Sequence, residues 1–232
     1  MAEDASGLSR SVEDYLKVIY SLCDSGRVAS TSAIAEGLEV QPASVTGMVK
    51  RLAESGFLEH VPYRGVQLTD AGTREALRIL RRHRILETYL TERLGYRWED
   101  VHGEAERLEH AASDRLIERM AAALENPSHD PHGAPIPTPS GEIETTDSFT
   151  LVELSPGVEA QVRAIRDDYA EGLKVAAAAG LLPGTGVVVV RRDLQKSVVV
   201  VVAESGIGER EVPFDVAQRV YVVPLPTSGP KG

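Results

Sequence analysis

The chain has 232 residues, of which 42% are hydrophobic and 26% charged, and a formal net charge of −10. This composition supports one or two globular domains, excludes a mainly disordered chain, and argues against a protein coated with positive charge for nonspecific nucleic-acid binding. The single cysteine, Cys23, excludes an intrachain disulfide framework and any zinc module with several cysteines, and its apolar setting predicts a buried structural thiol.

No apolar run approaches the roughly 18 residues that a membrane span needs, and the N-terminus "MAEDASGLSR" lacks a hydrophobic signal segment. We therefore expect a cytoplasmic protein with no membrane partner.

The first seventy residues follow the element order of a winged helix-turn-helix. Apolar residues recur at intervals of three and four over residues 10–23 and predict an amphipathic helix. Thr31 or Ser32 is expected to cap a short second helix, and Pro42 opens a third. The runs "FLEHV" and "GVQLT", joined by "PYRG", predict a β-hairpin. Residues 1–70 are thus a predicted DNA-binding domain.

Two long helices are expected next, one from a Thr69 cap to Gly95 and one over roughly 99–124. Their apolar residues exceed what a small domain can cover, so homodimerisation through these helices is expected. Residues 126–141 hold five of the 13 prolines and predict a non-helical connection. We assign residues 71–140 to a helical dimerisation and metal-binding domain.

The remaining chain changes to a β pattern. It alternates in "EAQVRAIR", continues in the β-branched runs "GVVVVRR", "SVVVVVAE" and "RVYVVPL", and is interrupted by an Ala-rich helix around Tyr169 to Ala179. These runs predict a small five-stranded barrel over residues 148–226. The predicted fold class is α+β, with a winged helix-turn-helix, a helical domain and a small SH3-like β-barrel.

The stretch "HGEAERLEHAASD", residues 102–114, places carboxylates and imidazoles on one face of a helix. This donor set is one that Mn²⁺ and Fe²⁺ accept. The preceding helix repeats the theme at a spacing of four. The candidate ligands on the two helices are His83, Glu87, His102, Glu106, Glu109 and His110. Helical neighbours alone seldom complete six-coordinate geometry, so a ligand from another element is expected, and Asp14 of the first helix is the candidate.

The predicted third helix should enter the major groove of DNA. The residues expected to contact DNA are Gln41, Ala43, Ser44, Thr46 and Gly47 near base edges, Lys50 and Arg51 nearer phosphates, and Tyr63 and Arg64 at the hairpin tip. Small side chains offer few hydrogen bonds to bases, so methyl contacts and DNA shape are expected to contribute to specificity.

Residues 8–140 resemble the diphtheria toxin repressor family of metal-dependent regulators in "VEDYLKVIYSL", "VTGMVKRLAESGFL", "RHRILETYL", "VHGEAERLEHAASD" and "PHGAPIP". The resemblance implies a homodimeric repressor that binds operator DNA when loaded with Fe²⁺ or Mn²⁺. It also implies a primary site and a set of ancillary ligands. The primary site would be Asp14, Glu106, Glu109 and His110, and the ancillary ligands His83, Glu87 and His102.

Departures from the iron-sensing members point to manganese. Those members have methionine at the position of Asp14 and cysteine at that of Glu106, whereas this chain is acidic at both, like the manganese-sensing branch. The hard oxygen donors favour Mn²⁺ by coordination preference. The manganese branch has a further acid at the position of Lys17. Because this chain has lysine there, its site differs from the two-metal cluster of that branch.

The segment "AAGLLPGTGVVVV" resembles the SH3-like barrel of longer members and of ferrous-transport accessory proteins. In longer members this barrel lends ligands to the ancillary site. By this resemblance Asp168 or Glu171 is expected to contribute one here, and Glu171 is included among the predicted metal ligands.

The first hypothesis is therefore a homodimeric repressor of metal-uptake genes that depends on Mn²⁺, with Fe²⁺ as the second candidate metal. Two alternatives stay open: a di-metal carboxylate enzyme, for which only "ERLEH" approaches the required Glu-x-x-His pattern, and a metal-independent winged-helix regulator that senses a small organic ligand. No nucleophile–base pair, phosphate-binding glycine loop or HExxH motif is present, so no catalysis is predicted.

Overall fold

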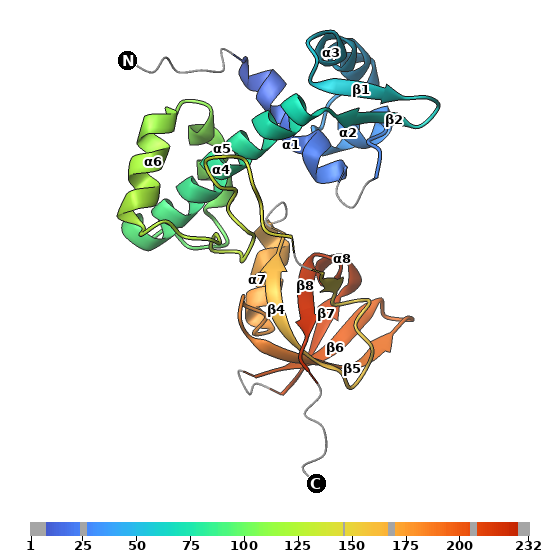
Figure 1. Ribbon diagram of the computed structural model, residues 1–232. Helices are drawn as coiled ribbons and strands as arrows, with labels where there is room; N and C mark the ends of the chain where they lie inside the picture. Colours follow the sequence, from blue (N-terminus) through green and yellow to red (C-terminus); the bar gives the residue numbers. More distant parts are fainter. Residues whose placement is uncertain (1–7, 24–26, 146, 167–169, 205–207, 227–232) are drawn as a thin grey trace. The chain divides into compact units, whose positions relative to one another are not determined.

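A computed structural model describes residues 8–23, 27–145, 147–166, 170–204 and 208–226 (Figure 1). The chain forms two compact units, called here the N-terminal and C-terminal units. The N-terminal unit contains Met1–Leu86, Glu106–Ala123 and Pro137–Ile143, and the C-terminal unit contains Glu87–Ala105, Leu124–Ile136 and Glu144–Gly232. No helix among the described residues is both long enough and apolar enough to cross a membrane.

The N-terminal unit begins with the predicted winged helix-turn-helix. Its elements are α1 (Arg10–Leu22), α2 (Thr31–Gly37), α3 (Pro42–Glu54), β1 (Leu58–Val61) and β2 (Gly65–Leu68). The two strands are antiparallel, with Leu58 opposite Leu68. The apolar faces of the three helices, which recur at helical spacing in the sequence, bury Leu16, Ile34 and Leu52 in one core.

Two local expectations in this region need correction. Ser30, rather than Thr31 or Ser32, caps α2: its Oγ accepts the Ala33 backbone N–H at 3.2 Å, and residue 30 is extended while residue 31 is already helical. Cys23 is half-buried rather than buried, and its Sγ donates to the Val66 carbonyl at 3.7 Å.

Helix α4 (Asp70–Leu94) matches the predicted long helix. Thr69 caps it, because the Thr69 Oγ1 accepts the Gly72 N–H at 3.1 Å. Gly95 ends it with a φ of +74°, a left-handed conformation that glycine adopts without steric cost.

The prediction of a single long helix over residues 99–124 is wrong. The structure has two helices there, α5 (His102–Glu109) and α6 (Asp114–Ala123). Ser113 starts the second one, since its Oγ accepts the Leu116 N–H at 3.3 Å. The Pro-rich segment 126–141 contains no helix, as predicted, and is ordered by a turn in which the Asp130 N–H donates to the Ala134 carbonyl at 3.0 Å.

The C-terminal unit carries a six-stranded antiparallel sheet in the order β3-β8-β4-β5-β6-β7. Its elements are β3 (Phe149–Thr150), β4 (Glu159–Ile165), α7 (Ala170–Ala178), β5 (Gly186–Asp193), β6 (Val198–Ala203), β7 (Glu209–Pro213), α8 (Phe214–Ala217) and β8 (Val220–Pro224). Five strands were expected, and six are present among the described residues. The two-residue β3 and the largely polar β7 lack the β-branched runs that marked the other strands.

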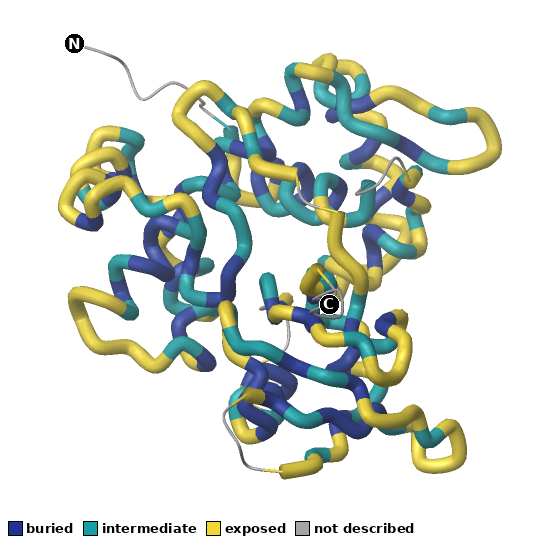
Figure 2. Tube along the Cα trace, turned by 60° about the horizontal axis from the view of Figure 1, so that its bottom comes forward, coloured by how far each residue is buried: buried dark blue, intermediate teal, exposed yellow. Residues whose placement is uncertain are grey.

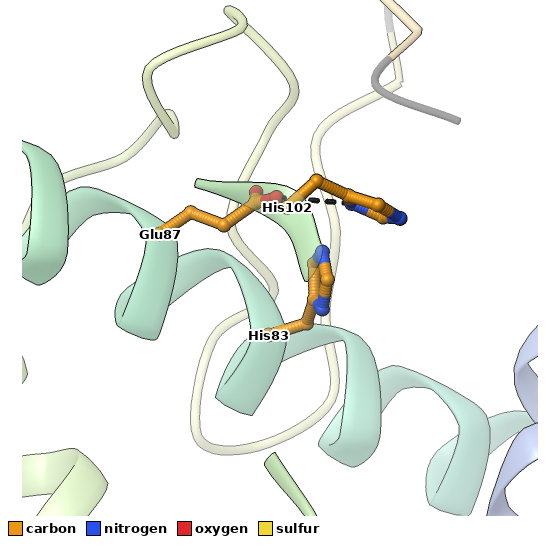
Figure 3. Close-up of side chains that lie close together, drawn as sticks. All are labelled: His83, Glu87 and His102. Atoms are coloured by element: carbon orange, nitrogen blue, oxygen red, sulfur yellow. Dashed lines mark hydrogen bonds and ion pairs between the residues drawn. The ribbon is translucent and has the colours of Figure 1, made fainter. Parts of the chain in front are cut away.

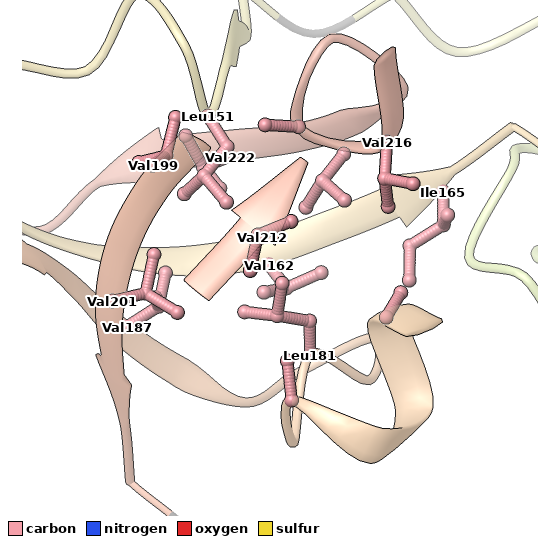
Figure 4. Close-up of a cluster of buried hydrophobic side chains, with 14 of the residues drawn as sticks. Leu151, Val162, Ile165, Leu181, Val187, Val199, Val201, Val212, Val216 and Val222 are labelled. Carbon is pink, nitrogen blue, oxygen red and sulfur yellow. The ribbon is translucent and has the colours of Figure 1, made fainter. Parts of the chain in front are cut away.

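The valine-rich runs build the core of this sheet. Val162, Val187, Val199, Val201 and Val222 are all buried in one cluster (Figure 4). Burial alternates along much of the strands, as expected for side chains that point to opposite faces (Figure 2).

Candidate metal centres and DNA-reading surface

The first cluster lies in the N-terminal unit and joins α1 to the end of α5. Ligand atoms of Asp14, Glu109 and His110 lie within 4.8 Å of one another. The His110 Nε2 is 3.0 Å from the Asp14 Oδ1 and 3.4 Å from the Glu109 Oε1. Helix α5 ends at Glu109, so His110 projects from the turn that follows. The structure therefore brings together three of the four residues predicted for the primary site.

The fourth residue, Glu106, is linked to the first cluster through Lys17. The Lys17 Nζ donates to the Glu109 Oε1 at 2.6 Å and lies 3.5 Å from the Glu106 Oε1. The Lys17 side chain is 18% exposed and the Glu106 side chain 47%. Burial alone would lower the pKa of Lys17, but Glu109, and then Glu106 and Asp14, raise that pKa above its usual value. Lys17 is thus a protonated ammonium within the cluster.

Glu109 has the most heavily bonded carboxylate of the first cluster. Its side chain is fully buried, with the Oε2 at 2.5 Å from the His83 Nδ1 and the Oε1 bonded to Lys17. Burial would raise the pKa of Glu109, yet His83 and Lys17 hold it below its usual value. Burial raises the pKa of Asp14, and His110 and Lys17 oppose that rise. His83, predicted as an ancillary ligand, therefore also contacts a residue of the primary set.

A buried carboxylate behind His110 was missed by sequence reasoning. The Glu13 Oε2 lies 2.7 Å from the His110 Nδ1, and the Glu13 Oε1 lies 3.8 Å from Arg78 and 3.6 Å from Arg82. A carboxylate on one ring nitrogen fixes the orientation of a histidine and leaves the other nitrogen for a metal. The available signal was an acid beside Val12 on the apolar face of α1.

The second cluster contains the three predicted ancillary ligands. His83 and Glu87 lie one turn apart on α4, and the His102 Nδ1 lies 3.2 Å from the Glu87 Oε1 (Figure 3). The ligand atoms of the three side chains lie within 4.8 Å of one another. Two imidazoles and one carboxylate form a donor set that divalent transition metals accept.

A third cluster in the C-terminal unit was not predicted. Ligand atoms of Glu87, Asp130 and His132 lie within 4.8 Å of one another, and all three residues are buried. The His132 Nε2 lies 2.6 Å from the Trp98 carbonyl, so this nitrogen must carry the proton and donate. The His132 Nδ1 lies 3.7 Å from the Glu87 Oε2. An imidazole nitrogen and carboxylate oxygens so close together form a donor set that a divalent metal accepts.

The signal for the third cluster was present in "SHDPHG", where three ligand-type residues occur inside the Pro-rich segment. That segment was interpreted only as a connection. The Asp130 Oδ1 accepts the backbone N–H groups of His132 and Ala134 at 2.8 and 2.9 Å, so this carboxylate also shapes the turn that presents His132.

The ligand expected from the C-terminal domain does not join these clusters. Glu171 is exposed, its Oε2 lies 3.4 Å from the Lys174 Nζ, and it belongs to none of the three clusters among the described residues. The alternative, Asp168, lies outside the described residues.

The predicted DNA-contacting residues share one property, which is exposure. Helix α3 buries Val45, Val49 and Leu52. All nine predicted residues are exposed: Gln41, Ala43, Ser44, Thr46, Gly47, Lys50, Arg51, Tyr63 and Arg64. A Cβ added at Gly47 would meet nothing within 4 Å, so packing does not require glycine there.

Family models match all three parts of the chain. The N-terminal DNA-binding domain of iron-dependent repressors matches residues 7–66, their metal-binding and dimerisation domain matches 69–138, and the FeoA domain matches 149–224. The chain is also 41% identical over 110 residues to the HTH-type transcriptional regulator MntR of Oceanobacillus iheyensis, covering 47% of this chain and 74% of that protein. The chain belongs to the iron-dependent repressor family.

Two further relatives extend the similarity across the chain. The diphtheria toxin repressor of Corynebacterium efficiens is 29% identical over 191 residues, which cover 78% of this chain and 83% of that protein. A solved manganese-dependent transcriptional repressor in complex with manganese is 37% identical, with a TM-score of 0.84, covering 92% of this chain and 100% of that one. The predicted family and the α+β fold with an SH3-like C-terminal domain are confirmed. The relatives named here are transcriptional regulators and not enzymes. The alternative of a di-metal carboxylate enzyme is therefore wrong.

Proposed function

We propose that this member of the family is a Mn²⁺-activated, homodimeric, cytoplasmic repressor that binds operator DNA of metal-uptake genes. The observation that carries the proposal is the first cluster, in which Asp14 of α1 meets Glu109 and His110 at the end of α5. The cluster offers carboxylate oxygens and an imidazole nitrogen, and it includes no sulfur. Such donors suit Mn²⁺, and Fe²⁺ as the second choice.

Asp14 connects this cluster to the DNA-reading elements. It lies on α1, whose Leu16 and Ile19 are fully buried in the core that also contains Val45 and Val49 of α3. A divalent ion supplies positive charge that offsets the repulsion between Asp14, Glu106 and Glu109. Once the repulsion is offset, Asp14 of α1 stays close to Glu109 and His110 at the end of α5. Because α1 and α3 share one core, the position of α3 is fixed with that of α1. DNA must tighten metal binding by the factor by which metal tightens DNA binding.

Glu87 is proposed to bind a second ion, because two sets of partners converge on its carboxylate. His83 and His102 form one set, and Asp130 and His132 form the other. The His132 Nδ1 lies 3.7 Å from the Glu87 Oε2, and both side chains are fully buried, which favours the set with Asp130.

Homodimerisation is proposed through the helical domain. Large apolar side chains remain exposed along it: Leu94, Tyr96, Leu108 and Leu116. Because such side chains are costly to leave in water, a second copy of the same surface is the economical cover. The match to a metal-binding and dimerisation domain supports this assignment.

The proposal is tested by fluorescence anisotropy with DNA from candidate metal-uptake promoters, titrated with Mn²⁺ or with chelator. We expect Mn²⁺ to tighten binding by roughly 5- to 150-fold, the usual range of allosteric coupling. The variant His110→Gln should lose most of this increase, whereas Glu92→Gln, which changes an exposed acid of α4, should retain it. Equal DNA affinity with Mn²⁺ and with chelator would refute the proposal. Unchanged DNA binding after Glu106→Ala and His110→Ala would favour a metal-independent regulator that senses an organic ligand.

A further inference from the structure

Lys17 places a positive charge inside the first cluster. It lies three residues after Asp14 on α1, so both side chains leave the same face of that helix. Its Nζ is 2.6 Å from the Glu109 Oε1 and 3.5 Å from the Glu106 Oε1, and the side chain is largely buried. The ammonium therefore bridges two carboxylates that were predicted as metal ligands.

The charges of the first cluster add up to the charge of one divalent ion. With the histidines counted as neutral, Asp14, Glu106 and Glu109 carry three negative charges and Lys17 carries one positive charge, which leaves a net charge of −2. Arg10 lies 3.9 Å from the Asp14 Oδ2, but its side chain is 65% exposed, so solvent screens its charge. Behind them, Arg78 and Arg82 lie within ion-pair distance of three acids, Glu13, Glu75 and Asp114, and so add no positive charge to the set. One divalent ion makes the set neutral, whereas a second would leave a net charge of +2 in a partly buried site.

The contacts of the Glu106 and Glu109 carboxylate oxygens also indicate that the first cluster has room for one divalent ion. Of the two oxygens of Glu109, one contacts the Lys17 ammonium and the other the His83 ring. The Glu106 Oε1 also faces Lys17. A second ion between Glu106 and Glu109 would compete with the ammonium for the Oε1 atoms of both carboxylates, and it would lie beside a like charge.

We propose that Lys17 is a built-in cation that limits the first cluster to one divalent ion per protomer. This inference rests on the proposed metal site and specifies its stoichiometry. Lys17 acts through Glu106 and Glu109 and replaces the charge of a second ion. Exchanging it for glutamate changes the net charge of the set from −2 to −4, which two divalent ions neutralise.

The test counts Mn²⁺ ions per protomer in a background that removes the Glu87 centres. In a His102→Gln, His132→Gln background, bound Mn²⁺ is measured by equilibrium dialysis and elemental analysis for Lys17, Lys17→Gln and Lys17→Glu. We expect one ion with Lys17 and two with Lys17→Glu. The affinity for the second ion should rise at least roughly tenfold at each step from lysine to glutamine to glutamate, because each step makes the site one charge unit more negative.

Electron paramagnetic resonance gives an independent readout, since two Mn²⁺ ions that share carboxylates couple magnetically and lose the six-line spectrum of an isolated ion. Lys196→Glu is the matched control, because it makes the same charge change in the exposed Lys196–Glu211 pair of the C-terminal unit. It should leave the count at one.

The outcomes separate the two proposals. Two ions with Lys17 present, or one ion in both Lys17→Gln and Lys17→Glu, would overturn the role of Lys17 while leaving the metal site in place. No ion in the unsubstituted first cluster would overturn the metal site itself, and the inference with it. If Lys17→Glu does not fold, Lys17→Gln still decides, because loss of the positive charge alone must make a weaker second ion detectable.

Discussion

The pair formed by Lys17 and Glu109 makes a prediction about the metal-free protein. Glu109→Gln removes a carboxylate whose side chain is fully buried and whose Oε1 lies 2.6 Å from an ammonium that is 18% exposed. Breaking a buried ion pair by removing one partner costs about 3–5 kcal/mol, because the other charge stays buried. Glu106 remains 3.5 Å from Lys17 and is half exposed, so a loss near the lower end, about 3 kcal/mol, is expected.

The double variant Lys17→Met, Glu109→Gln separates the stranded charge from other causes. It removes the ammonium together with its partner, so the combined loss of stability should be smaller than the sum of the two single losses by about 1–3 kcal/mol. The measurement is urea unfolding followed by far-UV circular dichroism at neutral pH, with chelator present so that metal binding does not contribute. Strictly additive single effects, or a Glu109→Gln protein as stable as the parent, would refute this account of the pair.

Three further predictions concern the winged helix and the start of α4, which packs against it. Gly72→Ala should lower the free energy of unfolding by about 1–3 kcal/mol in urea titrations, because the new Cβ would lie 2.1 Å from the Phe57 carbonyl oxygen; an unchanged midpoint would contradict this. Gly47→Ala should raise that free energy by about 0.5–1 kcal/mol yet weaken operator binding in anisotropy titrations, and unaltered DNA affinity would argue against α3 as the reading helix. Burial raises the pKa of Cys23, so iodoacetamide should alkylate it more slowly at pH 8 than a free thiol and faster as the pH rises; rapid labelling at pH 8 would show the thiol to be open to solvent.

Elements with a strong local signal could be predicted from the sequence. Residues 10–23 show helical periodicity, and the long helix adds a Thr69 cap and a Gly95 stop to the same periodicity; both segments match helices of the structure. The break between α5 and α6 was missed because apolar spacing continues across it, from Leu108 to Leu116 and Ile117. The Ser113 hydroxyl caps α6 and so fixes where that helix begins. Hydrophobic periodicity carries no information about such a cap.

The candidate site was predictable where ligand types recur at helical spacing. Asp14, Glu109 and His110 were expected to converge, and the structure brings them within reach of one another. Glu13 and His132 were not expected as contributors, because their roles depend on partners that are distant in the sequence: His110 for one, and Glu87 with the Trp98 carbonyl for the other. Tertiary contacts of this kind leave no periodic pattern in the chain.

The spacing that first indicated a metal site also explains why one helix face serves more than one centre. His102 and Glu109 are seven residues apart on α5, which corresponds to a rise of about 10 Å along the helix. A single ion with ligand bonds of about 2 Å cannot be reached by both side chains from that helix. His102 accordingly contacts Glu87, while Glu109 and His110 contact the residues of α1. A regular run of ligand types on a helix therefore predicts that metal is bound, whereas the distance along the helix determines how many separate centres its side chains can serve.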